Sequence, residues 1–508
     1  MKTSDYQFTP VRAGLITRLG RRLFCWQTVR RILVCFAVLA TLLAALYAFE
    51  NWRGKRAWEN ARCELEAKGE VLDWSAYIPP PVPDDQNMFK APKMQEWFVK
   101  NPGPRYISTN LSLSSRLTNS ATGSVGTANN VITNAMAARE YLAWSDGLTN
   151  EFNLIREALK RPYAIMDGDY QQPFEMPIPN FVTMRNLAQT LAQRAYCYLL
   201  LARPEEALRE LTLIHDLRHL LEARPTGKPM TLVSAMINVA VTGLYVNQIA
   251  EGLRLQAWGE TQLLTLQRQL EGIDLIAPVR MALKCEPAAV CHMMEAVSFS
   301  KLLSMGMVVS GTPRPKSLTD RLWDWVRGLK LRAFDLMPRG WIDQNMAVFF
   351  TLSQKPLDGF SVEGQLIEPV RVKKALKEFE AAMSRRSLFN LVANVAIPHS
   401  GKAIQTCARN QTLANQGAIA CALERYRIAN GNYPETLDVL VPQFIEKLPH
   451  DIVGGQPLKY QRTTDGKFLL YSIGWNETDD GGQVMRDKKG EVNVSSLDGD
   501  WVWPMTSR

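Results

Sequence analysis

Two histidines spaced four residues apart are the first candidates for chemistry in this sequence. His215 and His219 fall on one face of a predicted helix, so both imidazoles could bind the same metal ion. The residues between them, Asp-Leu-Arg, lack the glutamate that zinc peptidases carry at this place. The pair is therefore either part of a metal site or an ordinary pair on a helix surface.

A second group of candidate ligands follows at Cys285, Cys291 and His292. Its spacing matches no standard zinc site, and Pro287 within it can simply kink a helix. Glu286 has apolar neighbours, so it is either a buried carboxylate with a raised pKa or a helix cap or ion-pair partner. The sequence has no Gly-x-Ser-x-Gly elbow, P-loop or dinucleotide fingerprint, so acid–base chemistry would have to rest on carboxylates.

The last hundred residues have the clearest order of elements. A helix is predicted from Ala403 to Asn430, and Gly431 ends it. Two short strands follow, at residues 457–460 and 468–474, and Asp465-Gly466 between them is typical of a β-hairpin. An acidic loop with two glycines, residues 476–482, comes next.

This order of helix, hairpin and acidic loop resembles the globular part of the major pseudopilin of bacterial type II secretion. The resemblance covers residues 400–508 and implies a small α+β module at the end of a large membrane-anchored bacterial protein. In that family, acids in the loop after the hairpin hold a calcium ion. The corresponding residues here are Asp479, Asp480, Asp498 and Asp500, whose oxygen atoms suit calcium; the alternative is a solvated acidic turn.

Residues 135–399 are predicted to form an α-helical domain. Apolar side chains recur at helical spacing on both sides of Pro204, which predicts a helical hairpin of the tetratricopeptide type. Further helices are expected at residues 230–253, 259–272 and 276–305, so the fold class is mainly α with a helical-hairpin array. Residues 322–336 carry tryptophans among basic residues and are either a membrane-surface helix or a packed one.

A hydrophobic run without charges, residues 32–49, is the strongest feature near the start of the chain. Its 18 residues would span about 27 Å as a helix, close to the thickness of a hydrocarbon core. We expect a single transmembrane anchor that is not cleaved, rather than a signal peptide. Residues 50–134 are expected to be a juxtamembrane helix and then a linker rich in Pro, Ser and Asn.

The charge of the chain is concentrated before this run. Residues 1–31 carry seven basic side chains and one acid, which gives +6 of the net +9. This basic tail predicts a cytoplasmic N-terminus, with the bulk of the chain in the periplasm or outside the cell. The rest of the chain is nearly balanced in charge, so we expect no nucleic-acid partner.

Eight cysteines are present without a dense disulfide pattern or a Cys-x-x-Cys pair. Cys407 and Cys421 would lie about 21 Å apart on one helix, too far for a disulfide, and free thiols are expected.

These observations favour a membrane-tethered scaffold of the bacterial inner membrane that binds other proteins and is linked to a secretion or envelope assembly. Its partners would be the lipid bilayer, through residues 32–49, and other proteins. The alternative is an exported hydrolase with a carboxylate or metal site in the helical domain, and the sequence favours the non-enzymatic reading. Calcium is the single cofactor that the sequence suggests.

Overall fold

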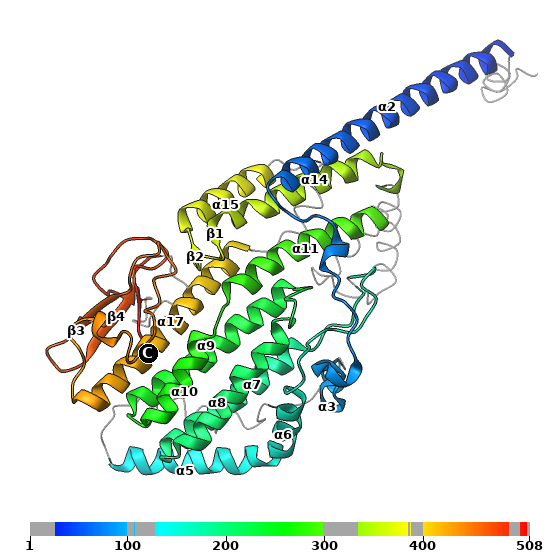
Figure 1. The fold of residues 1–508 in the computed structure, drawn as a ribbon. Coiled ribbons are helices and arrows are strands. Elements are labelled where there is room, and N and C mark those ends of the chain that lie inside the picture. The colour runs from blue at the N-terminus through cyan, green and yellow to red at the C-terminus, as the bar shows by residue number, and fades with distance from the viewer. Residues whose placement is uncertain are drawn as a thin grey trace, which may run out of the picture.

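A computed structural model describes residues 26–98, 106, 128–173, 175–297, 334–384, 387, 400–486 and 498–504. These residues form a mainly helical protein with few strands (Figure 1). The N-terminal part of the basic tail, most of the linker expected up to residue 134 and most of the segment 322–336 lie outside the described residues.

The helices are α2 (Trp26–Ala67), α3 (Pro92–Gln95), α5 (Ala128–Ser145), α6 (Thr149–Ala158), α7 (Phe181–Leu200), α8 (Pro204–Leu221), α9 (Leu232–Arg254), α10 (Glu260–Glu271), α11 (Ile276–Ala296), α14 (Gly340–Gln354), α15 (Pro369–Ser384) and α17 (Ser400–Asn430). The strands are β1 (Phe360–Ser361), β2 (Leu366–Ile367), β3 (Lys459–Arg462), β4 (Phe468–Ser472) and β5 (Trp501–Val502).

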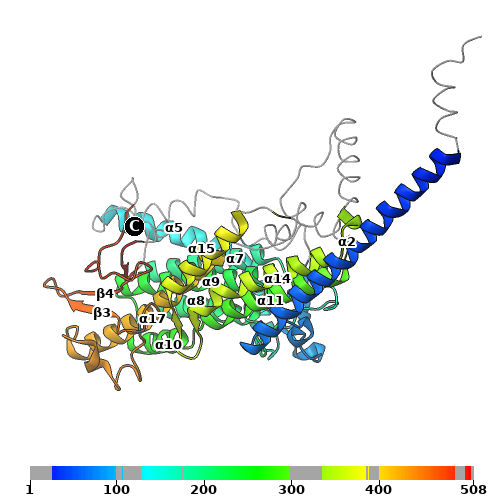
Figure 2. The ribbon, with the colours of Figure 1, turned by 90° about the horizontal axis from the view of Figure 1, so that it is seen from above.

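Helix α2 is one unbroken helix of 42 residues that contains both the apolar run and the expected juxtamembrane helix. In Figures 1 and 2 its first part runs away from the body, while its last part lies against it. The most apolar window of this helix is not buried by any part of the protein. The chain therefore has an N-terminal helix that is long and apolar enough to span a membrane.

Helix α9 passes the same test of length and hydropathy, but 56% of its window is buried in the protein. Val239, Tyr245 and Ile249 on this helix are almost fully buried. We therefore assign α9 to the core of the body rather than to a membrane.

Helices α7 and α8 pack against each other and against α9. Leu187 and Leu191 on α7, and Leu211 and Ile214 on α8, have no exposed surface, as their helical spacing predicts. The chain reverses at Ala202, which has a φ of 54°, and Pro204 opens α8 as predicted. Whether these helices belong to a regular repeat stays a prediction.

Helix α17 lies at the centre of the C-terminal part. It packs against α9, α10 and α11 as well as against β4 and the turn of 3₁₀ helix at Leu437–Leu440. Ala408, Ala414, Ala418 and Ala422 are buried along it, and such small side chains let neighbouring backbones approach closely. The close packing of α17 thus involves helices of the body in addition to the sheet.

The predicted hairpin is present. Strands β3 and β4 pair antiparallel, with Tyr460 opposite Leu470, and β5 pairs with the other edge of β4. Gly466 in the connecting turn has a φ of 78°, a conformation that glycine adopts without strain. Whether residues 400–508 form a domain of their own stays a prediction.

Residues 70–98 connect α2 to the body and lie against it. The proline-rich stretch forms no helix between Ile78 and Pro83, as expected. On either side of it, however, Trp74, Tyr77, Met94 and Trp97 are buried. This part of the expected linker therefore contributes to the core rather than forming a free spacer.

Candidate functional site

The structure places no third metal ligand beside the histidine pair on α8 among the residues it describes. The rings of His215 and His219 lie with their centroids 5.5 Å apart, and the Nδ1 atom of His215 is 3.3 Å from an Asp216 carboxylate oxygen. Burial, with a smaller effect from Arg224, lowers the pKa of His219 to about 4. The His215 ring also lies beside the Tyr245 ring, and this packing fits the helix-surface interpretation of the pair.

Glu286 caps a helix. Its Oε1 atom accepts a hydrogen bond of 2.7 Å from the backbone N–H of Leu232, the first residue of α9. The hydroxyl of Thr231 accepts a second one, from Ser234, so two N–H groups at this helix end have side-chain partners. Burial raises the pKa of Glu286, although the hydrogen bond from Leu232 opposes the shift. Glu286 is therefore both a helix cap and a buried carboxyl group with a raised pKa, the two alternatives that the sequence suggested.

The other candidates near Glu286 have separate partners. Cys285 and Cys291 are buried, and burial raises the pKa of the Cys285 thiol to about 12. His292 is within 3.2 Å of the Gln171 carbonyl oxygen instead. Among the residues that the structure describes, no three side chains of His, Cys, Asp or Glu form a group that could hold a metal ion.

The cysteines of the described chain are free thiols. Five of them are buried and two, Cys35 and Cys63, are exposed in the protein. The wide separation of Cys407 and Cys421 on α17 is in accord with the sequence prediction, and the Cys407 thiol donates to the Leu275 carbonyl instead. High thiol pKa values in buried positions leave these groups unreactive.

The acidic residues after the hairpin bind the backbone of their own loop. Asp500 is buried and accepts hydrogen bonds from the N–H groups of Gly482 and Asp480, at 2.6 and 3.3 Å. Asp479 lies 3.2 Å from the Lys459 ammonium group and accepts from the Tyr471 hydroxyl. Hydrogen bonds from Gly481 and Lys459 lower the pKa of Asp479.

As placed, these carboxylates do not form a closed ligand set, and Asp498 is exposed. The calcium ion implied by the resemblance stays a prediction. A calcium titration that follows the melting temperature would test it, because a ligand of the folded state raises the midpoint.

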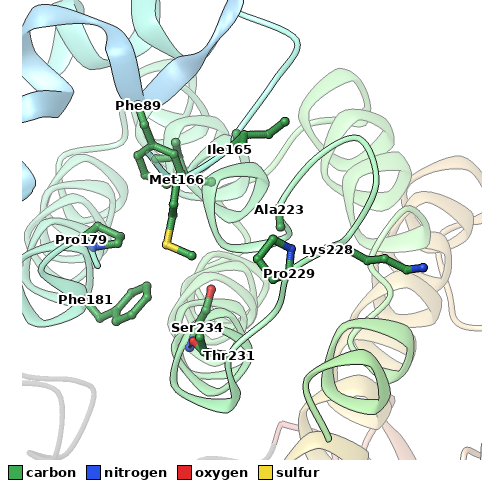
Figure 3. A pocket seen from close by; sticks show the side chains of 12 residues that line it. Phe89, Ile165, Met166, Pro179, Phe181, Ala223, Lys228, Pro229, Thr231 and Ser234 are labelled. Atoms are coloured by element: carbon green, nitrogen blue, oxygen red, sulfur yellow. Dashed lines mark hydrogen bonds between the residues drawn. The ribbon is translucent and has the colours of Figure 1, made fainter. Parts of the chain in front are cut away.

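A small pocket lies between residue 89, residues 164–166 and the first turns of α7 and α9 (Figure 3). Its lining is mostly apolar and includes Phe89, Ile165, Met166, Pro179, Phe181 and Pro229. In Figure 3 the Lys228 side chain extends away from the pocket, and its ammonium group is 3.4 Å from the Ala76 carbonyl oxygen. Ser234 and Thr231 are engaged at the start of α9. Lys228, Thr231 and Ser234 thus form hydrogen bonds with backbone groups instead of pointing free polar atoms into the pocket.

The junction between α2 and α14 is a close contact between two helix backbones. A Cβ atom on Gly54 would overlap the Gly340 carbonyl oxygen, and one on Gly340 would overlap the Glu50 carbonyl oxygen. Two helices can approach this closely only where side chains are missing. The ring centroids of Trp58 and Phe350 lie 6.4 Å apart further along the same contact.

Polar contacts fix the position of this junction at the end of the apolar run. Glu50 is 8% exposed and accepts hydrogen bonds from the Trp341 indole at 2.9 Å and from Arg53 at 2.7 Å. The backbone N–H of Gly340 donates to the Asn51 side chain at 2.9 Å. The contact joins α2 directly to the body, so the orientation of one depends on the other.

Sequence reasoning missed this junction. Glycine within a helical pattern often has a packing reason, and Gly54 carries that signal. Its partner is almost three hundred residues away, and nothing local connects Gly54 with Gly340.

Comparison with family models, with characterised proteins and with solved structures found no match to this chain.

Proposed function

We propose that this protein is a single-pass scaffold of the bacterial inner membrane, with its N-terminus in the cytoplasm and its body in the periplasm or outside the cell. The observation that carries the proposal is the exposed apolar part of α2, joined to a large helical body through the tight contact with α14. The basic residues before α2 support the orientation.

The body would act by binding other proteins of a secretion or envelope assembly. Packed helices of the kind formed by α7 to α10 commonly present a face or groove to a partner chain. The long helix α17 and the β3–β4 hairpin support the inferred likeness of residues 400–508 to a pseudopilin, whose docking would place the protein at such an assembly.

The hydrolase alternative is not part of the proposal. A pocket that gathers Glu286 with His215 or His292 would support it, and each of these side chains has its own partner elsewhere. The Glu286 carboxylate accepts a hydrogen bond from the first N–H group of α9 and so stabilises the start of that helix.

Labelling of Cys63 tests the topology, because this thiol is exposed and lies about 21 Å beyond the apolar run along α2. A maleimide that does not cross membranes should label Cys63 in intact spheroplasts, and Cys63→Ser should abolish that labelling. Labelling of Cys63 only after lysis would show that the body lies on the cytoplasmic side, which is the opposite of the proposed topology. Recovery of the intact protein in the soluble fraction would refute the membrane anchor.

Purification in mild detergent tests the scaffold role. We expect defined envelope proteins to co-purify in fixed proportion. A lone monomer recovered from several detergents would contradict the role without affecting the topology.

A further inference from the structure

Within the described part of the body, the start of α14 contacts α2 directly after the apolar run. Gly340, its first residue, contacts Glu50 and Asn51, which directly follow that run. Ten residues on, Phe350 lies beside Trp58, so α14 and the last part of α2 run side by side in the same direction. Figure 1 shows the same arrangement, with the start of α14 next to the point where α2 leaves the body.

The residues just before Gly340 therefore extend back toward the apolar run. They form a turn of 3₁₀ helix, Phe334–Leu336, and then Met337 to Arg339. The Leu336 side chain is 73% exposed, although leucine is a residue that folding normally buries. Leu336 precedes by four residues Gly340, which contacts Glu50 directly after the apolar run, where a bilayer changes from hydrocarbon to headgroups.

Two tryptophans lie near the same end of the apolar run. Trp52 on α2 is 57% exposed. The Cζ atom of the Arg56 guanidinium group lies over its ring, 5.6 Å from the ring centroid. Trp341 lies at the junction, with its indole N–H donated to Glu50. Tryptophan favours the membrane interface because its ring is apolar while its N–H needs a polar partner.

We propose that Leu336, together with Trp52 and Trp341, forms a second contact with the lipid bilayer beside α2. The occupant of this surface is the membrane that α2 crosses, because Trp52 follows the apolar run on that helix and Gly340, next to Trp341, contacts Glu50 at the end of the run. Arg339 stays on the body, where it donates to the Met294 and Glu295 carbonyl oxygens at the end of α11. The contact rests on the proposed membrane span of α2.

This contact would fix how the body stands on the membrane. A single helix alone leaves a body free to tilt, whereas a second point of attachment restricts it. The end of α11 and the start of α14 would rest on the bilayer. Strands β3 and β4 lie at the other end of the body in Figure 1, so they would face away from the membrane toward a partner.

Environment-sensitive labels in the full-length protein test the proposal. Cys25, Cys35 and Cys63 are changed to Ser, and one NBD fluorophore is attached through Leu336→Cys. The protein is reconstituted in vesicles of phosphatidylcholine with a minor share of phosphatidylglycerol. Leu39→Cys, in the middle of the apolar run, reports the span. Val439→Cys, 51% exposed and far along the chain, is the matched solvent control.

We expect the label at Leu336 to emit at shorter wavelength than the label at Val439 and to be quenched by lipids with a shallow nitroxide group. The label at Leu39 should be quenched best by a deep nitroxide group. A solvent-like label at Leu336 beside a quenched label at Leu39 would overturn the second contact and leave the span intact. A solvent-like label at both positions would refute the span and the contact together.

Discussion

At the scale of single residues, Glu286 caps the start of a helix although burial disfavours its charged form. Its position at the start of α9 supplies an acceptor for a backbone N–H that would otherwise have no partner. The same position removes the group from water, and burial raises its pKa. A raised pKa at a candidate catalytic residue is thus explained here by the needs of a helix end.

Replacement of Glu286 should separate the two effects. Because its pKa is raised in the folded state, the folded protein binds the proton more tightly than the unfolded chain does. The resulting stability is fully present below the ordinary pKa of 4.5 and is lost as the pH rises through the folded value. Glu286→Gln keeps the acceptor and is always neutral, so at about pH 8 it should melt at a higher temperature than the unmodified protein.

The matched comparisons are a second variant and a second pH. Glu286→Ala removes the acceptor and should lower the free energy of unfolding by about 1–2 kcal/mol at both pH values. The difference between Glu286→Gln and the unmodified protein should vanish near pH 4 in thermal melts followed by circular dichroism. A lower melting temperature of Glu286→Gln at about pH 8 would show that the charge itself stabilises α9.

At the scale of elements, the crossing of α2 and α14 depends on two missing side chains. Gly54→Ala should lower stability by roughly 1–3 kcal/mol, because the new methyl group meets the Gly340 backbone and not a flexible side chain. Alanine favours a helix over glycine by about 1 kcal/mol, so the clash has to exceed this gain. The measurement is a thermal melt of the detergent-solubilised protein.

Gly147→Ala is the matched control, since a Cβ atom there would meet nothing within 4 Å. It should leave the melting temperature nearly unchanged. Equal melting temperatures for the two variants would mean that α2 does not depend on close contact with α14.

Elements with local signals could be predicted from the sequence. The helix expected from Ala403 to Asn430 is found at Ser400–Asn430, and α9 and α10 begin and end within two residues of their expected bounds. The hairpin follows from Asp465-Gly466, because glycine there allows the conformation of the turn. Periodicity and turn residues act over a few positions, so one sequence is enough to read them.

Features that depend on distant partners could not be predicted. Met94 and Trp97 have no exposed surface, yet their segment has no regular pattern and was expected to be part of a linker. For Glu286 the sequence left two alternatives, and only the start of α9 next to it decides its main task. The Gly54–Gly340 contact joins positions whose proximity is a property of the tertiary fold.

At the scale of the whole molecule, helix α2 and the body share one core. A continuous cluster of buried side chains extends from Leu65 in α2 to Trp503 near the C-terminus. Just after α2, Glu70 and Lys284 form an ion pair of 2.7 Å that joins the chain to α11. The last part of α2 is therefore a structural helix of the body, although it continues the apolar run without a break.

Two shortened chains should show which part of α2 belongs to the body. A chain that begins at Glu50 keeps Trp58 and Leu65 and should melt close to the full-length protein. A chain that begins at Glu70 loses both, and the loss of the buried Leu65 alone removes about 1.5–3 kcal/mol of apolar burial. It also uncovers Phe350, which is fully buried, so it should melt lower and aggregate on size-exclusion chromatography. Equal melting temperatures of the two chains would place the boundary of the body after α2, and the orientation of the body would then have to be set by other contacts.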